Sequence, residues 1–153
     1  MAAREAGNMK KMQLVTMFAV VAITGFALTG CSSITDQLQR EKSSEFASTQ
    51  DLTTNWTQTV AWLPADATQI KTREAAAGGP AILSATTTAQ LDVSQCAETT
   101  RQSAPTYSDV WSPENVYVDR VFACGDWAVI KTDSGWYGWT PNDPDEKAVS
   151  PAR

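Results

Sequence analysis

The chain has 153 residues, with 12 basic and 17 acidic side chains and no histidine, so its formal net charge is -5. The absence of histidine excludes Ser-His-Asp triads, Cys-His dyads and histidine-ligated zinc. The acidic balance argues against nucleic acid and anionic lipid headgroups as partners, because both are bound through Lys and Arg.

The first thirty residues have the order of a secretory signal peptide. Three basic residues between positions 4 and 11 precede an almost uncharged apolar stretch from Met12 to Leu28. This stretch is slightly long for a signal peptide and short for a membrane-spanning helix. A methionine directly precedes the last two basic residues, so both Met1 and Met9 are candidate starts.

The apolar stretch ends in Leu28-Thr29-Gly30-Cys31, which resembles the lipobox of bacterial lipoproteins: an aliphatic residue, two small ones and a cysteine. This resemblance implies cleavage after Gly30 and a thioether-linked diacylglycerol on Cys31, with palmitate as a typical acyl chain. Two acyl chains are sufficient for stable anchoring. We therefore predict a lipid anchor on the extracytoplasmic face of the cell membrane. The alternative, an uncleaved membrane-spanning anchor, gives the same topology because the basic end stays cytoplasmic.

Removal of residues 1–30 would leave 123 residues, which is room for one domain and a tether. The removed segment carries three bases and one acid, so the remainder is more acidic than the whole chain. Residues 31–48 are polar and lack a sustained apolar pattern. We predict that they form the lipidated tether.

Residues 49–62 are predicted to form a helix. Ser48 and Asp51 resemble a capping box in which Asp replaces Glu, and Pro64 ends the segment. Large apolar residues recur at i, i+4, i+8 and i+11, which is one helical face: Leu52, Trp56, Val60 and Leu63. We expect this face to lie in the core.

After Pro64 the pattern changes to strands and turns. Gln69–Glu74 and Ala81–Thr87 are predicted to form a hairpin around a Gly-Gly-Pro turn, and residues 92–115 are irregular. The last third predicts a meander of three strands with short glycine-containing turns: Val116–Ala123, Trp127–Thr132 and Trp136–Thr140.

Together these elements predict a small α+β domain over residues 49–141. It would have an antiparallel sheet of about five strands and one or two helices. The final residues, 142–153, are polar and contain prolines, and we predict a disordered tail.

Cys96 and Cys124 remain as an even pair once Cys31 is assigned to lipid. In an exported, oxidising setting such a pair favours a disulfide. Closing a loop of 28 residues would contribute about 3–4 kcal/mol in the chain-entropy model. A redox-active role would need closely spaced cysteines or a lowered pKa, and the sequence indicates neither.

Aromatic residues are the compositional feature most suited to binding, with six tryptophans in the chain. Trp136, Tyr137 and Trp139 lie in one strand, so Trp136 faces one side while Tyr137 and Trp139 share the other. We predict that one side is exposed and binds a partner through its rings. The alternative is that all three fill the core of a small domain.

No catalytic, metal or cofactor site is predicted. Asp119, Asp126 and Asp133 would be candidates for paired general acid and base chemistry, but two of them lie at turns where Asp is common. The acids of residues 143–146 lack the spacing and glycine of a calcium loop.

The pattern of cysteines and tryptophans resembles small uncharacterised lipoproteins of high-GC Gram-positive (actinobacterial) bacteria. The residues that carry this resemblance over most of residues 60–141 are Cys31, Trp62-Leu63-Pro64, Asp66-Ala67, Ala81-Ile82-Leu83, Cys96, Trp111, Pro113, Cys124-Gly125, Trp127, Trp136-Tyr137 and Trp139. The resemblance implies a cell-envelope location and no particular activity. We expect a non-catalytic envelope module that binds a protein or glycan partner. The alternatives are a purely structural or accessory lipoprotein without a small ligand and, more distantly, a hydrolase.

Overall fold

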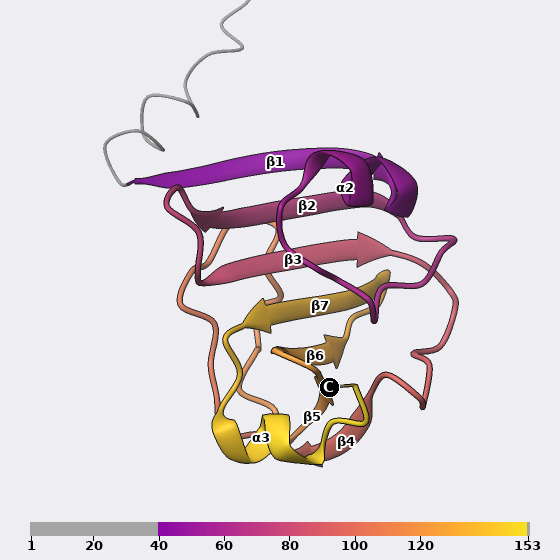
Figure 1. The fold of residues 1–153 in the computed structure, drawn as a ribbon, viewed down its shortest axis with the longest axis vertical. Coiled ribbons are helices and arrows are strands. Elements are labelled where there is room, and N and C mark those ends of the chain that lie inside the picture. The colour runs from indigo at the N-terminus through magenta and orange to yellow at the C-terminus, as the bar shows by residue number, and fades with distance from the viewer. Residues whose placement is uncertain (1–39, 153) are drawn as a thin grey trace, which may run out of the picture.

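The computed structural model describes residues 40–152, so the predicted signal peptide, Cys31 and the first part of the predicted tether lie outside the described residues. Seven strands form one antiparallel sheet in the order β1-β2-β3-β7-β6-β5-β4 (Figure 1). The strands are β1 (Glu41–Ser48), β2 (Thr68–Ala75), β3 (Ala81–Thr86), β4 (Ala97–Thr100), β5 (Arg120–Cys124), β6 (Trp127–Lys131) and β7 (Gly135–Thr140). Two short helices, α2 (Thr49–Asn55) and α3 (Pro144–Val149), complete the described elements.

The predicted hairpin and meander are confirmed, within a larger sheet than the five strands expected. Strand β2 pairs with β3, and β5, β6 and β7 pair in sequence. The two units are joined by pairing of β3 with β7, which sets Ser84 opposite Tyr137 and Ile82 opposite Trp139. The predicted strand over 116–123 begins only at Arg120.

The predicted tether over residues 31–48 is wrong from Glu41 onward, because Glu41–Ser48 forms the edge strand β1 along β2. Phe46 is the buried residue of this strand. Apart from Ala47, the remaining side chains are polar or charged, as is usual on exposed sheet edges, where charge discourages pairing with other chains. That composition gives an edge strand the appearance of a tether.

The predicted tail over residues 142–153 is also wrong, because Pro144–Val149 forms helix α3 beside β4 and β5 (Figure 1). Asp143 and Glu146 form a capping box, and a proline occupies the first turn. Glu146 is completely buried. A polar segment can thus be ordered by caps and one buried carboxylate rather than by an apolar stripe.

The helix predicted over 49–62 is confirmed only as far as Asn55. Ser48 accepts a hydrogen bond from the Asp51 N–H, as expected for an N-cap, while the Asp51 carboxylate accepts from the Ala47 N–H. Thr53 and Thr54 bond to carbonyls four residues back, which competes with helix propagation. The apolar residues beyond the helix are nonetheless buried or half-buried, so the predicted core role was correct.

Both faces of the sheet carry core residues. We name the side packed against α2 and residues 56–67 the helix face, and the opposite side, packed against residues 101–119, the loop face. Figure 1 shows α2 in front of the sheet and the 101–119 segment behind it. On the helix face a row of rings packs with centroids 5.9 to 6.5 Å apart: Phe46, Trp56, Trp127 and Trp62.

Gly138 makes this packing possible on the central strand β7. A Cβ added at Gly138 would lie only 2.8 Å from Cζ2 of Trp62. The absence of a side chain therefore lets the indole of Trp62 lie directly on the sheet. Its Nε1, like that of Trp56, has no hydrogen-bond partner among residues 40–152.

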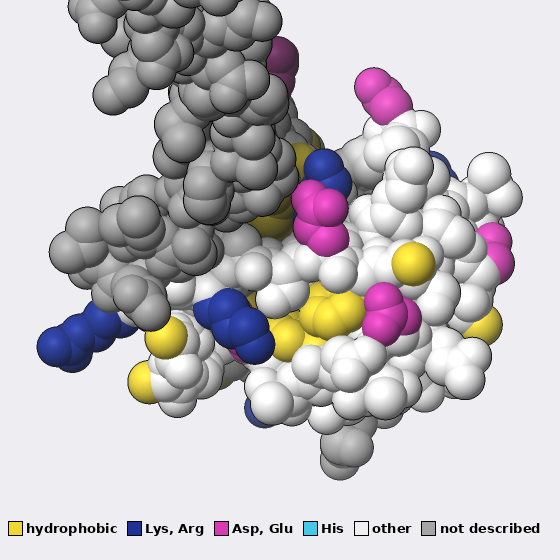
Figure 2. Space-filling model, turned by 90° about the horizontal axis from the view of Figure 1, so that it is seen from above, with side chains coloured by type: hydrophobic (Ala, Val, Ile, Leu, Met, Phe, Trp, Pro, Cys, Tyr) yellow, Lys and Arg dark blue, Asp and Glu magenta, His cyan; other side chains and the backbone are white. Residues whose placement is uncertain are grey.

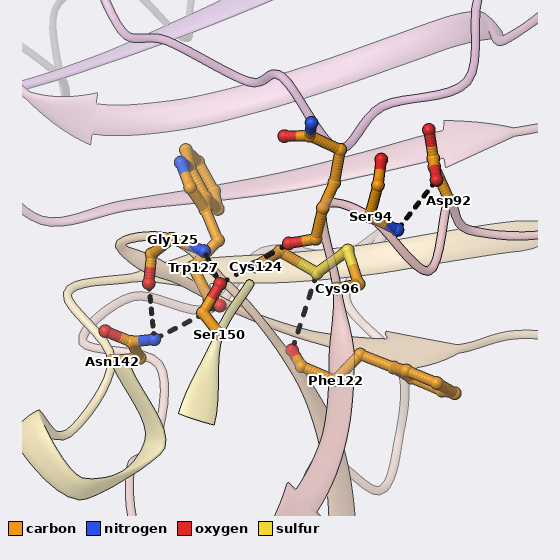
Figure 3. Close-up of a disulfide and its surroundings, with 10 residues drawn as sticks. Asp92, Ser94, Cys96, Phe122, Cys124, Gly125, Trp127, Asn142 and Ser150 are labelled. Atoms are coloured by element: carbon orange, nitrogen blue, oxygen red, sulfur yellow. Dashed lines mark hydrogen bonds between the residues drawn. A yellow bond between two sulfur atoms is a disulfide. The ribbon is translucent and has the colours of Figure 1, made fainter. Parts of the chain in front are cut away.

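The predicted disulfide between Cys96 and Cys124 is present and joins the start of β4 to the end of β5 (Figure 3). Figure 3 also shows how the C-terminal region lies against this bond: Gly125 N–H donates to Ser150 Oγ at 2.7 Å. The Gly125 carbonyl accepts from Asn142 Nδ2 at 2.9 Å. Because the disulfide joins Cys96 to Cys124, it fixes the short strand β4, which lies in the segment predicted to be irregular.

We predict that replacing Cys96 and Cys124 together by alanine lowers the free energy of unfolding by about 3–4 kcal/mol, because the unfolded chain regains the freedom of a 28-residue loop. Denaturant titration would measure this loss. A reductant should destabilise the native protein but leave the double variant unchanged. Peptide mass spectrometry that finds both cysteines as free thiols would contradict the assignment.

Candidate functional site

The proposed aromatic binding surface at Trp136, Tyr137 and Trp139 is wrong. Their side chains are 2%, 0% and 0% exposed. Alternation places Trp136 on the helix face and the other two on the loop face, as predicted, but both faces are covered at β7. These rings are core.

Residues 101–119 form the cover over the loop face. The ring of Trp111 packs against Tyr137 with centroids 6.3 Å apart, and Ser112 Oγ lies 3.3 Å from the Tyr137 hydroxyl. Trp139 Nε1 donates to Ser103 Oγ at 2.8 Å. The two loop-face rings of β7, Tyr137 and Trp139, are thus both buried and hydrogen-bonded by this segment.

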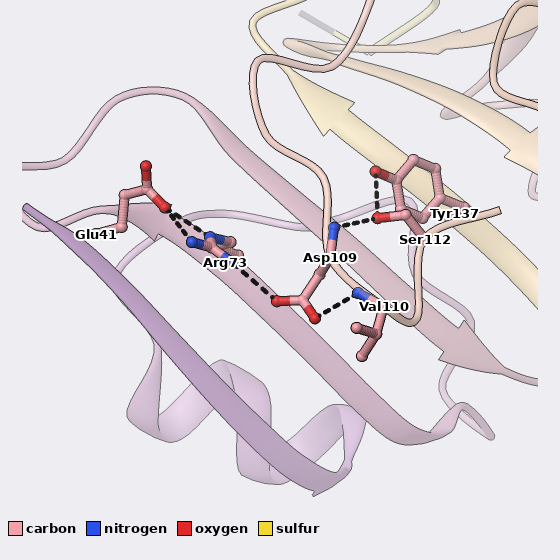
Figure 4. Close-up of polar contacts among 6 residues, drawn as sticks. All are labelled: Glu41, Arg73, Asp109, Val110, Ser112 and Tyr137. Carbon is pink, nitrogen blue, oxygen red and sulfur yellow. Dashed lines mark hydrogen bonds and ion pairs between the residues drawn. The ribbon is translucent and has the colours of Figure 1, made fainter. Parts of the chain in front are cut away.

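Arg73 of β2 pins the cover to the sheet (Figure 4). Its guanidinium donates to Glu41 at 2.6 Å and to Asp109 at 3.1 Å. Burial alone would lower the pKa of Arg73, but hydrogen bonds and charge interactions with the two carboxylates outweigh it and raise the pKa above its ordinary value. All three side chains are largely buried, so this pair of contacts is worth more than surface ion pairs. It fixes β1 and the 109–112 turn to the same strand.

Beyond this cover, part of the loop face over β1, β2 and β3 stays open. Two surface hollows of about 750 and 510 Å³ share Ser84, Trp111 and Ser134, and we call them together the trough. The first hollow extends to Glu45 on β1, and the second to Asn115 and the β6–β7 turn. Figure 2 looks onto the β1 side of the molecule and shows a mostly uncharged surface, with isolated acidic and basic side chains around a small apolar patch.

A distortion of β2 lies at the rim of the trough. The register between β2 and β3 shifts between Thr68 and Lys71, and Gln69 has a φ of 49°, in the left-handed region that non-glycine residues seldom adopt. The Gln69 side chain accepts a hydrogen bond from Thr86 Oγ1 at 3.4 Å. Bulges and strained residues often aim a side chain at a functional site.

The sequence offered little signal for this site. In the sequence Trp111 carries only a family resemblance, and Gln69 and Ser84 carry only the alternation of a hairpin. The one usable signal is that Trp111 lies in a segment without apolar periodicity. The large ring of such a residue must either pack on another element or face solvent. Trp111 does both, since it is half-buried.

Asp126 and Asp133 do not form a catalytic pair. Asp126 and Asp133 lie at opposite ends of β6, about 20 Å apart at 3.3 Å per residue, whereas paired glycosidase carboxylates lie within about 10 Å. Asp126 pairs instead with Lys147. Over residues 40–152 no three His, Cys, Asp or Glu side chains are grouped so as to hold a metal ion.

A third hollow of about 590 Å³ lies beside the disulfide and is lined by Trp62, Trp127 and Cys124. Its two indoles belong to the helix-face core, and Trp127 Nε1 already donates to the Thr59 carbonyl at 3.1 Å. The trough is therefore the better candidate.

None of the helices in residues 40–152 has the length and apolar character to cross a membrane.

Comparisons with known proteins give no match, whether to family models, to curated proteins or to solved structures. The candidate site therefore rests on the geometry described above.

Glu146 of α3 anchors the beginning of the cover. Its carboxylate accepts from the N–H groups of Gln102 and Ser103 and from Ser103 Oγ, the last at 2.6 Å. The Asp143 N–H donates to it as well, at 3.3 Å. Burial would raise the pKa of Glu146, but these hydrogen bonds outweigh burial and lower the pKa below its ordinary 4.5.

A carboxylate with a lowered pKa stabilises the fold above its unfolded pKa and loses that contribution as pH falls below it. We predict that Glu146→Gln costs about 1–3 kcal/mol at neutral pH. We also predict that it weakens the loss of stability on acidification from about pH 5 to pH 3. Unfolding titrations at several pH values measure both. Asp145→Asn, on the exposed side of α3, is the matched control. Equal pH dependence in the native protein and Glu146→Gln would rule out this role.

Proposed function

We propose that the protein is a lipid-anchored module on the extracytoplasmic face of the cell membrane, which binds a protein or glycan partner without transforming it. The observation that carries the binding role is the trough, an open, rigidly framed surface beside a half-buried tryptophan. The anchoring rests on Leu28-Thr29-Gly30-Cys31. The disulfide supports an oxidising compartment, where such bonds persist.

The length of chain between anchor and domain supports a role close to the membrane. Ten residue steps separate Cys31 from Glu41, where β1 begins, and a fully extended chain covers at most about 36 Å over that length. The domain would therefore remain within this distance of the lipid. A module held so close to the surface would meet components of the envelope rather than distant partners.

A purely structural lipoprotein is the second candidate, and the burial of the tryptophans favours it. Five of the six are core residues: Trp56, Trp62, Trp127, Trp136 and Trp139. The aromatic excess is thus largely explained by packing. The two candidates differ in what happens at the trough, where only the binding module requires a partner.

We predict that Cys31→Ala abolishes labelling by radioactive palmitate and leaves a full-length precursor, because the thioether and the cleavage both require this cysteine. Cys96 and Cys124 serve as internal controls, since they are bonded to each other. Equal labelling of the variant and the native protein would disprove the anchor.

The binding role is tested in living cells with a photo-crosslinking residue at Ser134, which lines both hollows of the trough. Val93, exposed on the 87–95 segment, is the control position. A binding module should give an adduct from Ser134 that is absent from Val93 and reduced by Trp111→Ala. Identical patterns from both positions would favour the structural alternative.

A further inference from the structure

We propose that the trough binds a neutral, extended glycan strand, with Trp111 as the ring on which a sugar stacks. This inference rests on the binding role proposed above and names its ligand class.

The trough is long rather than deep. Its two hollows, of about 750 and 510 Å³, meet at Ser84, Trp111 and Ser134 and run from β1 to the β6–β7 turn. A single hollow is already as large as a typical small-molecule pocket. Two in line, both open to solvent, suit several linked units of a polymer better than one compact ligand.

The strands that form the floor of the trough favour a glycan over an extended peptide as the ligand. Strands β2 and β3 are internal to the sheet and pair on both sides, so their backbone groups cannot accept an added strand. Strand β1 has a free backbone edge, but its charged side chains, among them Glu45, discourage the addition of a strand there. A ligand must be held by side-chain hydroxyl and amide groups, which match the hydroxyls of sugars. Six such side chains line the trough: Gln69, Ser84, Thr86, Asn115, Thr132 and Ser134.

The charges of the trough favour a neutral ligand. Lys71 lies 3.8 Å from Glu45, and Lys131 lies 4.6 Å from the ring centroid of Trp136, so both cations already have partners. Glu114 and Asp133 add exposed negative charge. An anionic polymer would meet net repulsion here.

Trp111 is held in place before any ligand arrives. Its ring rests on Tyr137, and the turn that carries it is closed by hydrogen bonds between Asp109 and Ser112. Arg73 ties Asp109 to the sheet. An aromatic platform with so little freedom loses little entropy on binding, and its apolar face can pack on the C–H face of a sugar ring.

The test measures binding of soluble hexasaccharides to the full protein, purified in detergent from expressing cells. The neutral probes are β-1,4-linked N-acetylglucosamine, β-1,4-linked glucose and α-1,6-linked mannose, and a polygalacturonate hexamer is the anionic probe. We expect at least one neutral probe to bind. We expect Trp111→Ala to weaken it about tenfold or more, as truncation of a binding hot spot does.

Tyr117→Ala is the matched control, because Tyr117 is an exposed ring on the same segment outside the trough. Ser84→Glu, which adds bulk and charge to the floor while leaving Trp111 in place, should also abolish binding if Trp111→Ala proves unstable. Failure of every neutral probe, or binding that neither variant changes, would overturn the glycan assignment. If a peptide or protein were then captured at Ser134, the binding module would stand with a different ligand class. No adduct at all would overturn both proposals.

Discussion

Pairing of β3 with β7 is the interaction on which the rest of the structure depends. It joins a hairpin that ends at Thr86 to a meander that begins only at Arg120, and it makes one sheet of two small ones. All six residues of β7 are buried, as expected for a strand covered on both faces. A slip of one residue would exchange the two faces of β7. It would move Trp136 away from Ala89, whose carbonyl accepts its indole N–H at 3.0 Å.

The register of this pairing also decides where the trough lies. Ile82 and Trp139 pair with each other under the cover, whereas Ser84, two residues further along β3, lies at the edge of the cover. The cover is fixed at two points, by Arg73 on β2 and by Glu146 on α3. The open part of the loop face thus follows from a change along the strands from apolar to polar side chains. The same change leaves Trp111 packed on one side and accessible on the other.

The hairpin, the meander and the disulfide could be predicted because each has a local signal: alternation, glycine turns and an even pair of cysteines. Strand β1 could not, since its order comes from pairing with β2 and from the buried contact at Arg73, which leave no apolar period. Helix α3 had a local signal in Asp143, Pro144 and Glu146, but no apolar stripe accompanies it, because its buried residue is a carboxylate. The alternation argument placed Trp136, Tyr137 and Trp139 on the correct faces. The same argument wrongly predicted that one side of β7 is exposed to solvent. The cover over that side is made by scattered residues of an irregular segment, whose position depends on long-range contacts.

Five tryptophans are buried in the core on the two faces of the sheet, each at most 6% exposed, and within residues 40–152 only Trp111 is half-buried. Quenching of tryptophan fluorescence by iodide tests this most directly, by comparing the native protein with Trp111→Phe. The account predicts that nearly all quenchable emission disappears in the variant while the emission of the buried indoles persists. Unchanged quenching in Trp111→Phe would show that another tryptophan is exposed, and would contradict both the core assignment and the trough.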